Sequence, residues 1–273
     1  MSRYAVLSVT LLLSLAVTET RAADEADILD APEIDMSRAA RAERSWYIRG
    51  DIGYAPWIGE GNPDLRTYQP GGAPATGASF DSARFSEPFS FGAGVGYQFG
   101  DMFRADLTAE YFRGDMTGGS GASCAGGGGT CGFSHDADYD AFAIMANGYV
   151  DLGTLAGFTP YVGAGVGATY LDWGDVAGRC RQGAGGCADE NRVSGSLPGL
   201  GDWRFTYALM AGASYDLSDR VKLDLSYRFS DIAGGDMFGY DTTERALGAS
   251  GAKGKDDGFQ RHEFRVGLRV SLW

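Results

Sequence analysis

The chain has 273 residues and is acidic, since 36 Asp and Glu oppose 23 Lys and Arg and give a formal net charge of −13. This balance argues against nucleic acid as a partner, because phosphate backbones bind surfaces rich in Lys and Arg. Glycine is abundant, with 43 residues, but it follows no period of three, which argues against a collagen-like chain.

Residues 1–22 have the features of a signal peptide. Arg3 provides a positive start, and residues 5–17 form an apolar run. Thr20 and Ala22 place small residues at the two positions that signal peptidase reads, so we expect cleavage directly after Ala22. An uncleaved anchor is the alternative, but the run is shorter than the ~20 residues that a helical bilayer span needs.

We interpret residues 23–45 as a largely disordered periplasmic lead-in. The segment is acidic between Asp24 and Asp35 and basic from Arg38 to Arg44. Its charge and its lack of strand alternation leave little apolar surface with which to build a core. Residues 46–273 are then expected to form one β domain.

Helix signals are nearly absent after residue 45, and period-two alternation recurs eight times. In the third segment, for example, Leu107 and Tyr111 share one face, whereas Asp106 and Glu110 share the other. Most of these segments match the ~9–11 residues that a tilted strand needs to cross a bilayer. The eight segments are 46–54, 89–99, 103–112, 140–152, 159–170, 203–215, 221–229 and 262–272.

The connections between these segments alternate in length. Long ones cover about 55–88, 113–138, 171–202 and 230–262, and short ones cover 100–102, 153–158 and 216–220. Short periplasmic turns and long outer loops are typical of transmembrane barrels. Closing such a meander removes its two sheet edges. The sequence therefore predicts an all-β fold: an eight-stranded antiparallel up-and-down transmembrane β-barrel with four long extracellular loops.

The two faces of these segments differ in charge. The apolar faces carry no charge and end in aromatic residues such as Trp46 and Tyr54, as the interfacial girdles of membrane barrels do. A soluble β-sandwich is the alternative, because alternation alone does not say which face meets water. With the signal peptide, we favour lipid on the apolar face. We therefore predict a charge network in the lumen, formed by Arg49, Asp51, Arg104, Asp106, Glu110, Lys222, Asp224, Arg228, Glu263, Arg265 and Arg269.

A glycine repeat occurs on the inward face of two segments. Gly92-Ala-Gly-Val-Gly96 recurs as Gly163-Ala-Gly-Val-Gly167. The interior of an eight-stranded barrel is just wide enough for side chains, so small residues on some strands leave room for Arg, Tyr and Glu from others. A nucleotide-binding loop is the alternative, but no helix follows either repeat and the glycines keep the strand period.

Four cysteines fall in two identical spacings, Cys124-x6-Cys131 and Cys180-x6-Cys187. Four cysteines allow three pairings, of which the two local links are the easiest to close. An exported chain matures in an oxidising compartment, so we predict these two disulfides. A metal site is the alternative, but histidines at finger-like spacing are missing. We expect no metal and no cofactor.

Two motifs carry a family resemblance. The segment Trp46-Tyr-Ile-Arg-Gly-Asp-Ile-Gly-Tyr54 and the ending Arg261-His-Glu-Phe-Arg-Val-Gly-Leu-Arg269, together with the glycine repeats, resemble small outer-membrane β-barrel proteins of alphaproteobacteria, the opacity-type and OmpA-like barrels. The resemblance implies an eight-stranded barrel in the outer membrane of a Gram-negative cell, with a structural or surface-antigen role and no catalytic residues. One departure is that Trp273 lies one residue beyond the outward phase.

These features favour a structural and cell-surface function with a lumen plugged by charged residues. A narrow porin is the first alternative and an outer-membrane lipid-modifying enzyme the second. Only two histidines could serve an enzyme, His135 beside Asp136 and His262 beside Glu263. Expected partners are outer-membrane lipids, lipopolysaccharide, the barrel assembly machinery through the last strand, and an unidentified surface ligand.

Mass spectrometry of unreduced peptides checks the cysteine pairing. We expect Cys124 linked to Cys131 and Cys180 linked to Cys187, because each pair closes a short loop. Free thiols, or a link between Cys124 and Cys187, would show that this pairing is wrong.

Overall fold

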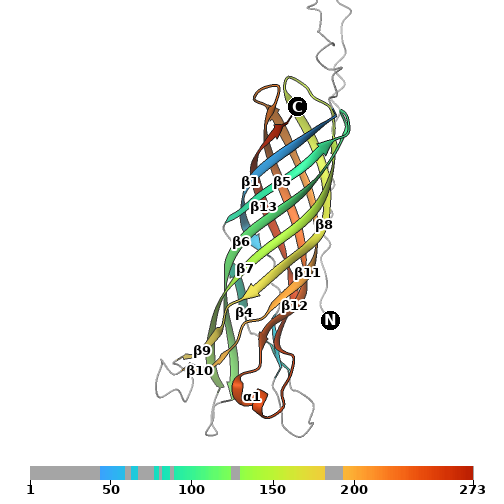
Figure 1. Ribbon diagram of the computed structural model, residues 1–273. Helices are drawn as coiled ribbons and strands as arrows, with labels where there is room; N and C mark the ends of the chain where they lie inside the picture. Colours follow the sequence, from blue (N-terminus) through green and yellow to red (C-terminus); the bar gives the residue numbers. More distant parts are fainter. Residues whose placement is uncertain are drawn as a thin grey trace, which may run out of the picture. The chain divides into compact units, whose positions relative to one another are not determined.

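A computed structural model describes residues 44–58, 63–66, 77–79, 82–86, 89–123, 130–181 and 193–272 (Figure 1). The predicted signal peptide, nearly all of the predicted lead-in, and Trp273 lie outside these residues.

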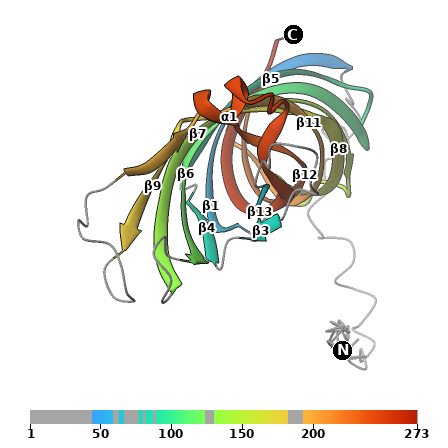
Figure 2. The same ribbon diagram turned by 90° about the horizontal axis from the view of Figure 1, so that it is seen from below.

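Eight long strands form the main structure, and each is antiparallel to its neighbours. They are β1 (Ser45–Ile58), β5 (Phe89–Gln98), β6 (Phe103–Ser123), β7 (Thr130–Asp151), β8 (Phe158–Trp173), β11 (Gly201–Asp216), β12 (Val221–Gly239) and β13 (Ala252–Ser271). Each pairs with the next along the chain, and β13 pairs with β1, so the sheet closes on itself (Figure 2). The predicted eight-stranded barrel is confirmed.

Three short turns join strands at the end of the barrel that we assign to the periplasm. They connect β5 to β6, β7 to β8, and β11 to β12. In the second turn, Gly153 has φ +102° and Gly157 has φ +83°, conformations that L side chains rarely adopt. The short turns therefore fall where the alternating loop lengths predicted them.

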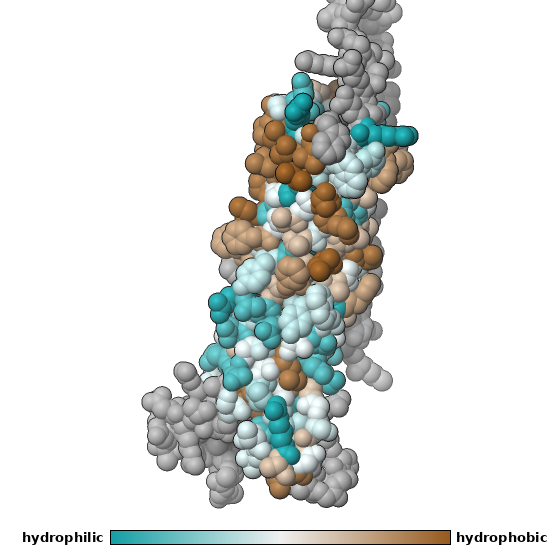
Figure 3. Space-filling view, in the orientation of Figure 1, coloured by the Kyte–Doolittle hydropathy of each residue, from teal (hydrophilic) through white to brown (hydrophobic). Residues whose placement is uncertain are grey.

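The outward face of the barrel is apolar over one part of its height. Leu107 and Phe205 are 58% and 60% exposed, whereas Arg104 on the inward face is only 2% exposed. Aromatic pairs border this zone at the outer edge, at Tyr54–Phe89 and Tyr170–Trp203, and at the periplasmic edge, at Trp46–Tyr97 and Phe158–Tyr215. Figure 3 shows the brown apolar surface giving way to teal towards the loop end. We call this zone the apolar band.

Several strands continue well beyond the apolar band, into segments that the sequence suggested were loops. β6 runs to Ser123, β7 begins at Thr130, and β12 and β13 pair as far as Gly239 and Ala252. There the apolar side chains are on the inward face and the charged ones on the outward face. Phe112 and Tyr139 are buried inside, whereas Arg113 and Asp138 face out. Water outside the barrel favours polar side chains on the outer face, so the inversion marks the outer edge of the lipid.

Short elements complete the outer part. They are β2 (Asp64–Arg66), β3 (Gly77–Ser79), β4 (Ser82–Ser86), β9 (Val176–Arg181), β10 (Val193–Leu197) and the helix α1 (Thr242–Ala246). Asp241 caps α1, since its side chain accepts from the Glu244 N–H and Glu244 reaches back to the Asp241 N–H. Within the described ranges, no helix is long and apolar enough to cross a membrane.

Candidate functional site: the charged barrel interior

The barrel interior holds buried charges of both signs in equal number. Among the described residues, seven arginines and seven carboxylates are buried, each 8% exposed or less. A buried charge is costly unless an opposite charge and hydrogen bonds compensate it, so equal numbers fit an internally paired interior. The residues are Arg49, Arg104, Arg204, Arg228, Arg261, Arg265, Arg269, Asp51, Asp106, Glu110, Asp151, Asp224, Asp256 and Glu263.

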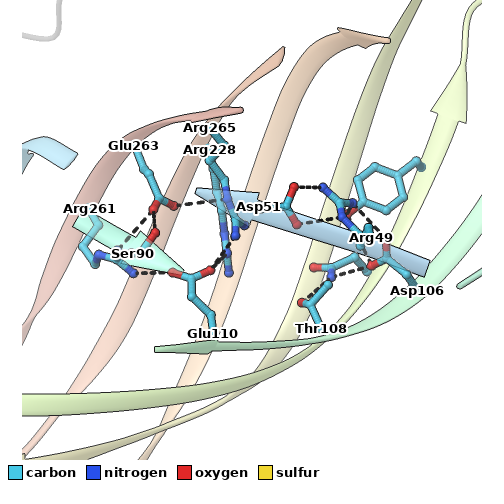
Figure 4. A network of polar contacts seen from close by, with 12 residues as sticks. Arg49, Asp51, Ser90, Asp106, Thr108, Glu110, Arg228, Arg261, Glu263 and Arg265 are labelled. Carbon is cyan, nitrogen blue, oxygen red and sulfur yellow. Dashed lines mark hydrogen bonds and ion pairs between the residues drawn. The ribbon is translucent and has the colours of Figure 1, made fainter. Parts of the chain in front are cut away.

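Glu110 on β6 lies at the centre of the largest group (Figure 4). Its carboxylate is 2.5 Å from Arg228 Nη1 on β12, and it is 3.0 Å and 3.1 Å from Arg265 Nη2 and Arg261 Nη1 on β13. Glu263 lies beside these arginines, with its Oε1 3.5 Å from Arg261 Nη2, and it accepts from the Ser90 hydroxyl. β6 does not pair with β12 or β13, so these contacts cross the lumen. We call Glu110, Arg228, Arg261, Glu263 and Arg265 the Glu110 cluster.

Arg49 organises a second group towards the periplasm, visible on the right of Figure 4. Its guanidinium makes two contacts with Asp51, at 2.9 Å and 2.7 Å, and one with Asp106 Oδ2, at 2.9 Å. Asn147 and the Tyr47 hydroxyl also donate to Asp106, at 2.8 Å and 3.1 Å. Asp106 on β6 is therefore held by donors from two other strands, β1 and β7, and this fixes the side chains across the lumen.

Arg104 forms a third layer near the periplasmic end. Its Nε lies 3.1 Å from Asp151 Oδ1, and its guanidinium carbon lies 4.2 Å and 4.3 Å from the ring centroids of Tyr149 and Tyr161. The two rings are nearly perpendicular to each other, at 85°, so the guanidinium gains cation–π attraction from two sides of one corner of the lumen. In the same region Arg269 Nε is 3.4 Å from Asp224 Oδ2.

Another buried ion pair, Arg204 with Asp256, lies outside the apolar band. Arg204 Nη1 on β11 is 2.7 Å from Asp256 Oδ2 on β13, and both side chains are fully buried. Burial raises the pKa of the Asp256 carboxyl above its usual range, although Arg204 and the Gly258 N–H oppose this rise.

The inward glycines allow the long side chains to approach the wall. A Cβ on Gly92 would lie 2.9 Å from Arg265 Nη2, and one on Gly163 would lie 2.9 Å from the Gly148 carbonyl oxygen and in conflict with the Tyr149 ring. Real Cβ atoms essentially never make contacts this short, so both repeats supply space that Arg265 and Tyr149 fill.

The structure brings together nearly all residues predicted for the lumen network. Lys222 is the exception, because its side chain is 31% exposed at the periplasmic rim, where it contacts Asp216. Sequence reasoning left Asp151, Arg204, Asp256 and Arg261 out of the network. Arg204 could have been found from its phase opposite Phe205, but Asp256 could not, because the buried positions of β13 change along the chain from even to odd numbers across Gly258, which has φ +99°.

The other candidate residues lie apart from this interior. Cys124 and Cys187 are outside the described residues, and Cys131 in β7 and Cys180 in β9 are described for their backbone only, so the predicted disulfides stay a prediction. His262 lies on the outer face, with Nδ1 2.5 Å from the Tyr227 hydroxyl. His135 lies in the outer part of β7, where burial lowers its pKa. In the described part of the chain, no group of three or more His, Cys, Asp or Glu side chains could hold a metal ion.

The chain is similar to several known proteins. The family model described as outer membrane protein beta-barrel domain matches residues 10–270. An uncharacterised protein of Brucella suis is 32% identical over 280 residues, which cover 94% of this chain and 95% of that protein. A putative adhesin of Rickettsia bellii is 31% identical over 87% of this chain and 92% of its own length. The crystal structure of the outer membrane protein OprG from Pseudomonas aeruginosa has 15% identity and a TM-score of 0.45, over 85% of this chain and 97% of that one.

Neutralising the centre of the Glu110 cluster tests its contribution to stability. We expect Glu110→Gln to lower the free energy of unfolding by about 3–5 kcal/mol, because three buried guanidinium groups lose a shared carboxylate. The control is Asp138→Asn, which removes a carboxylate that is 50% exposed and paired with Arg113 outside the barrel, and which should cost less than about 1 kcal/mol. Urea unfolding from lipid vesicles, followed by tryptophan fluorescence, measures both. Equal effects of the two substitutions would contradict a stabilising role for the cluster.

Proposed function

Because this chain belongs to the outer membrane protein β-barrel family, we propose that it serves a structural and cell-surface role in the outer membrane and that its lumen does not conduct. The observation that carries this proposal is the equal number of buried arginines and carboxylates that meet across the interior. Fully paired charges hold the strands together and leave little free charge with which to attract an ion.

The dimensions of the barrel support a closed lumen. Eight strands enclose an interior that side chains can fill, whereas water-filled porins use 16 strands or more. Here Tyr149 and Tyr161 pack edge to face beside Arg104 at the periplasmic end, and the Glu110 cluster spans the middle. A narrow porin would need a continuous column of water past both layers.

The outer part of the barrel supports a role at the cell surface. From Tyr111 to Ser123, β6 rises by about 3.3 Å per residue at a tilt of roughly 40°, so its tip reaches about 30 Å beyond the apolar band. The outer face of this part carries exposed charges such as Arg113 and Asp138. The Rickettsia bellii relative is named a putative adhesin, and we extend a surface-contact role to this chain as part of the proposal.

The proposal includes a route and partners. Export uses the signal peptide 1–22 with cleavage after Ala22, and residues 23–45 stay in the periplasm. Outer-membrane lipids surround the apolar band, lipopolysaccharide meets its outer edge, and the assembly machinery binds the last strand. The chemistry proposed is non-enzymatic.

Planar bilayer recordings test the proposal. The purified full chain without its leader should give at most small, irregular currents, because paired charges and the Tyr149 and Tyr161 rings fill the lumen. An open porin of known conductance serves as the positive control. Large, steady and ion-selective conductance steps from this chain would contradict the closed lumen and favour the narrow porin.

A further inference from the structure

A cluster of aromatic side chains fills the lumen on the outer side of the Glu110 cluster. Tyr139, Trp173, Phe238 and Phe259 are each 3% exposed or less, and Phe85 packs against them. The Trp173 ring lies 4.9 Å from the Tyr139 ring and 5.7 Å from the Phe238 ring, between centroids. We call these five residues the aromatic cap.

The cap is built across the interior and not along one wall. Trp173 comes from β8 and Phe259 from β13, which are not neighbours in the sheet, yet their ring centroids are 6.4 Å apart. Phe85 on β4 lies 5.2 Å from Phe259 and 6.1 Å from Trp173. Rings from opposite walls therefore contact one another inside the lumen.

The cap lies directly on the charged layer. Phe259 is two residues from Arg261 on β13, and the guanidinium carbon of Arg261 lies 3.8 Å from the ring centroid of Phe112, an apolar neighbour of the cap. A path through the barrel from outside therefore meets the aromatic cap before it meets the Glu110 cluster.

A buried ion pair and a hydrogen bond, both made by Arg204, hold the cap in place. Arg204 on β11 binds Asp256 on β13 and donates from Nη2 to the Asp236 carbonyl on β12, at 2.9 Å. Its guanidinium carbon is 5.7 Å from the Phe259 ring centroid. The β12–β13 hairpin, which carries Phe238 and Phe259, is thus tied to the neighbouring strand.

We infer that the aromatic cap is a permeability barrier in series with the Glu110 cluster, able to block ions by itself. An apolar constriction excludes water and so raises the energy of an ion in it, whatever the charge of the ion. The inference rests on the proposed closed lumen, and it states where closure occurs: at the charged layers and, independently of them, at the aromatic cap.

Single and combined removal of the layers in planar bilayers tests the inference. The network variant is Arg104→Ala/Arg228→Ala, which removes one arginine from the periplasmic layer and one from the Glu110 cluster. The cap variant is Trp173→Ala/Phe259→Ala, and the third protein carries all four changes. Because either layer blocks ions, neither double variant should give steady steps, and the fourfold variant should give them. The matched control adds Phe205→Ala/Phe264→Ala, which removes two outward rings, to the network variant. This control protein should give no steady conductance steps.

Each outcome decides something different. Steady steps from the network variant alone, as large as those of the fourfold variant, would show that the cap does not block ions. The proposal that the wild-type lumen is closed would still stand. A folded fourfold variant without steps would also overturn the inference; folding is checked by circular dichroism and by the heat-dependent gel shift of barrels. Steps from the wild-type chain would instead overturn the proposed function.

Discussion

Lipid on the outside of a closed sheet is the constraint on which this molecule depends. Hydrocarbon satisfies no hydrogen bond, so every backbone group of the band must pair within the sheet, and polar side chains can only turn inward. Once inside, a charge has no bulk water and must find an opposite charge. Of the seven buried arginines and seven buried carboxylates, all but Arg204 and Asp256 lie in this band, and Glu110 and Asp106 each serve several donors from other strands.

The same constraint explains why the outer part of the barrel has the opposite pattern. Above Tyr111 the environment outside is water, so Arg113 and Asp138 face out while Phe112 and Tyr139 pack inside. One sheet thus encloses a charged interior where it crosses the membrane, and where it projects it encloses apolar side chains together with the Arg204–Asp256 pair. The junction of the two gives the lumen layers of opposite character.

The strand pattern predicts the fold because apolar and polar residues alternate without a break across each membrane segment. The same phase places Glu110, Arg228 and Arg265 inside, but it cannot say that they meet, because partners across the lumen depend on the stagger of non-adjacent strands. The aromatic cap escaped prediction for a different reason. Inward rings such as Trp173 stand among outward polar residues and glycines that suggest loops, and the change of phase at Gly258 hides Asp256.

A spin-label scan along β6 tests directly whether lipid covers the apolar band. Single cysteines replace outward positions from Leu107 to Asp115 in a chain whose four native cysteines are serine, and the labelled barrels are refolded into vesicles. Collisions with oxygen should dominate at Leu107 and Tyr111, and collisions with a water-soluble nickel chelate should dominate at Arg113 and Asp115. Nickel access at Leu107 equal to that at Asp115 would contradict the account, because water would then cover the face assigned to lipid.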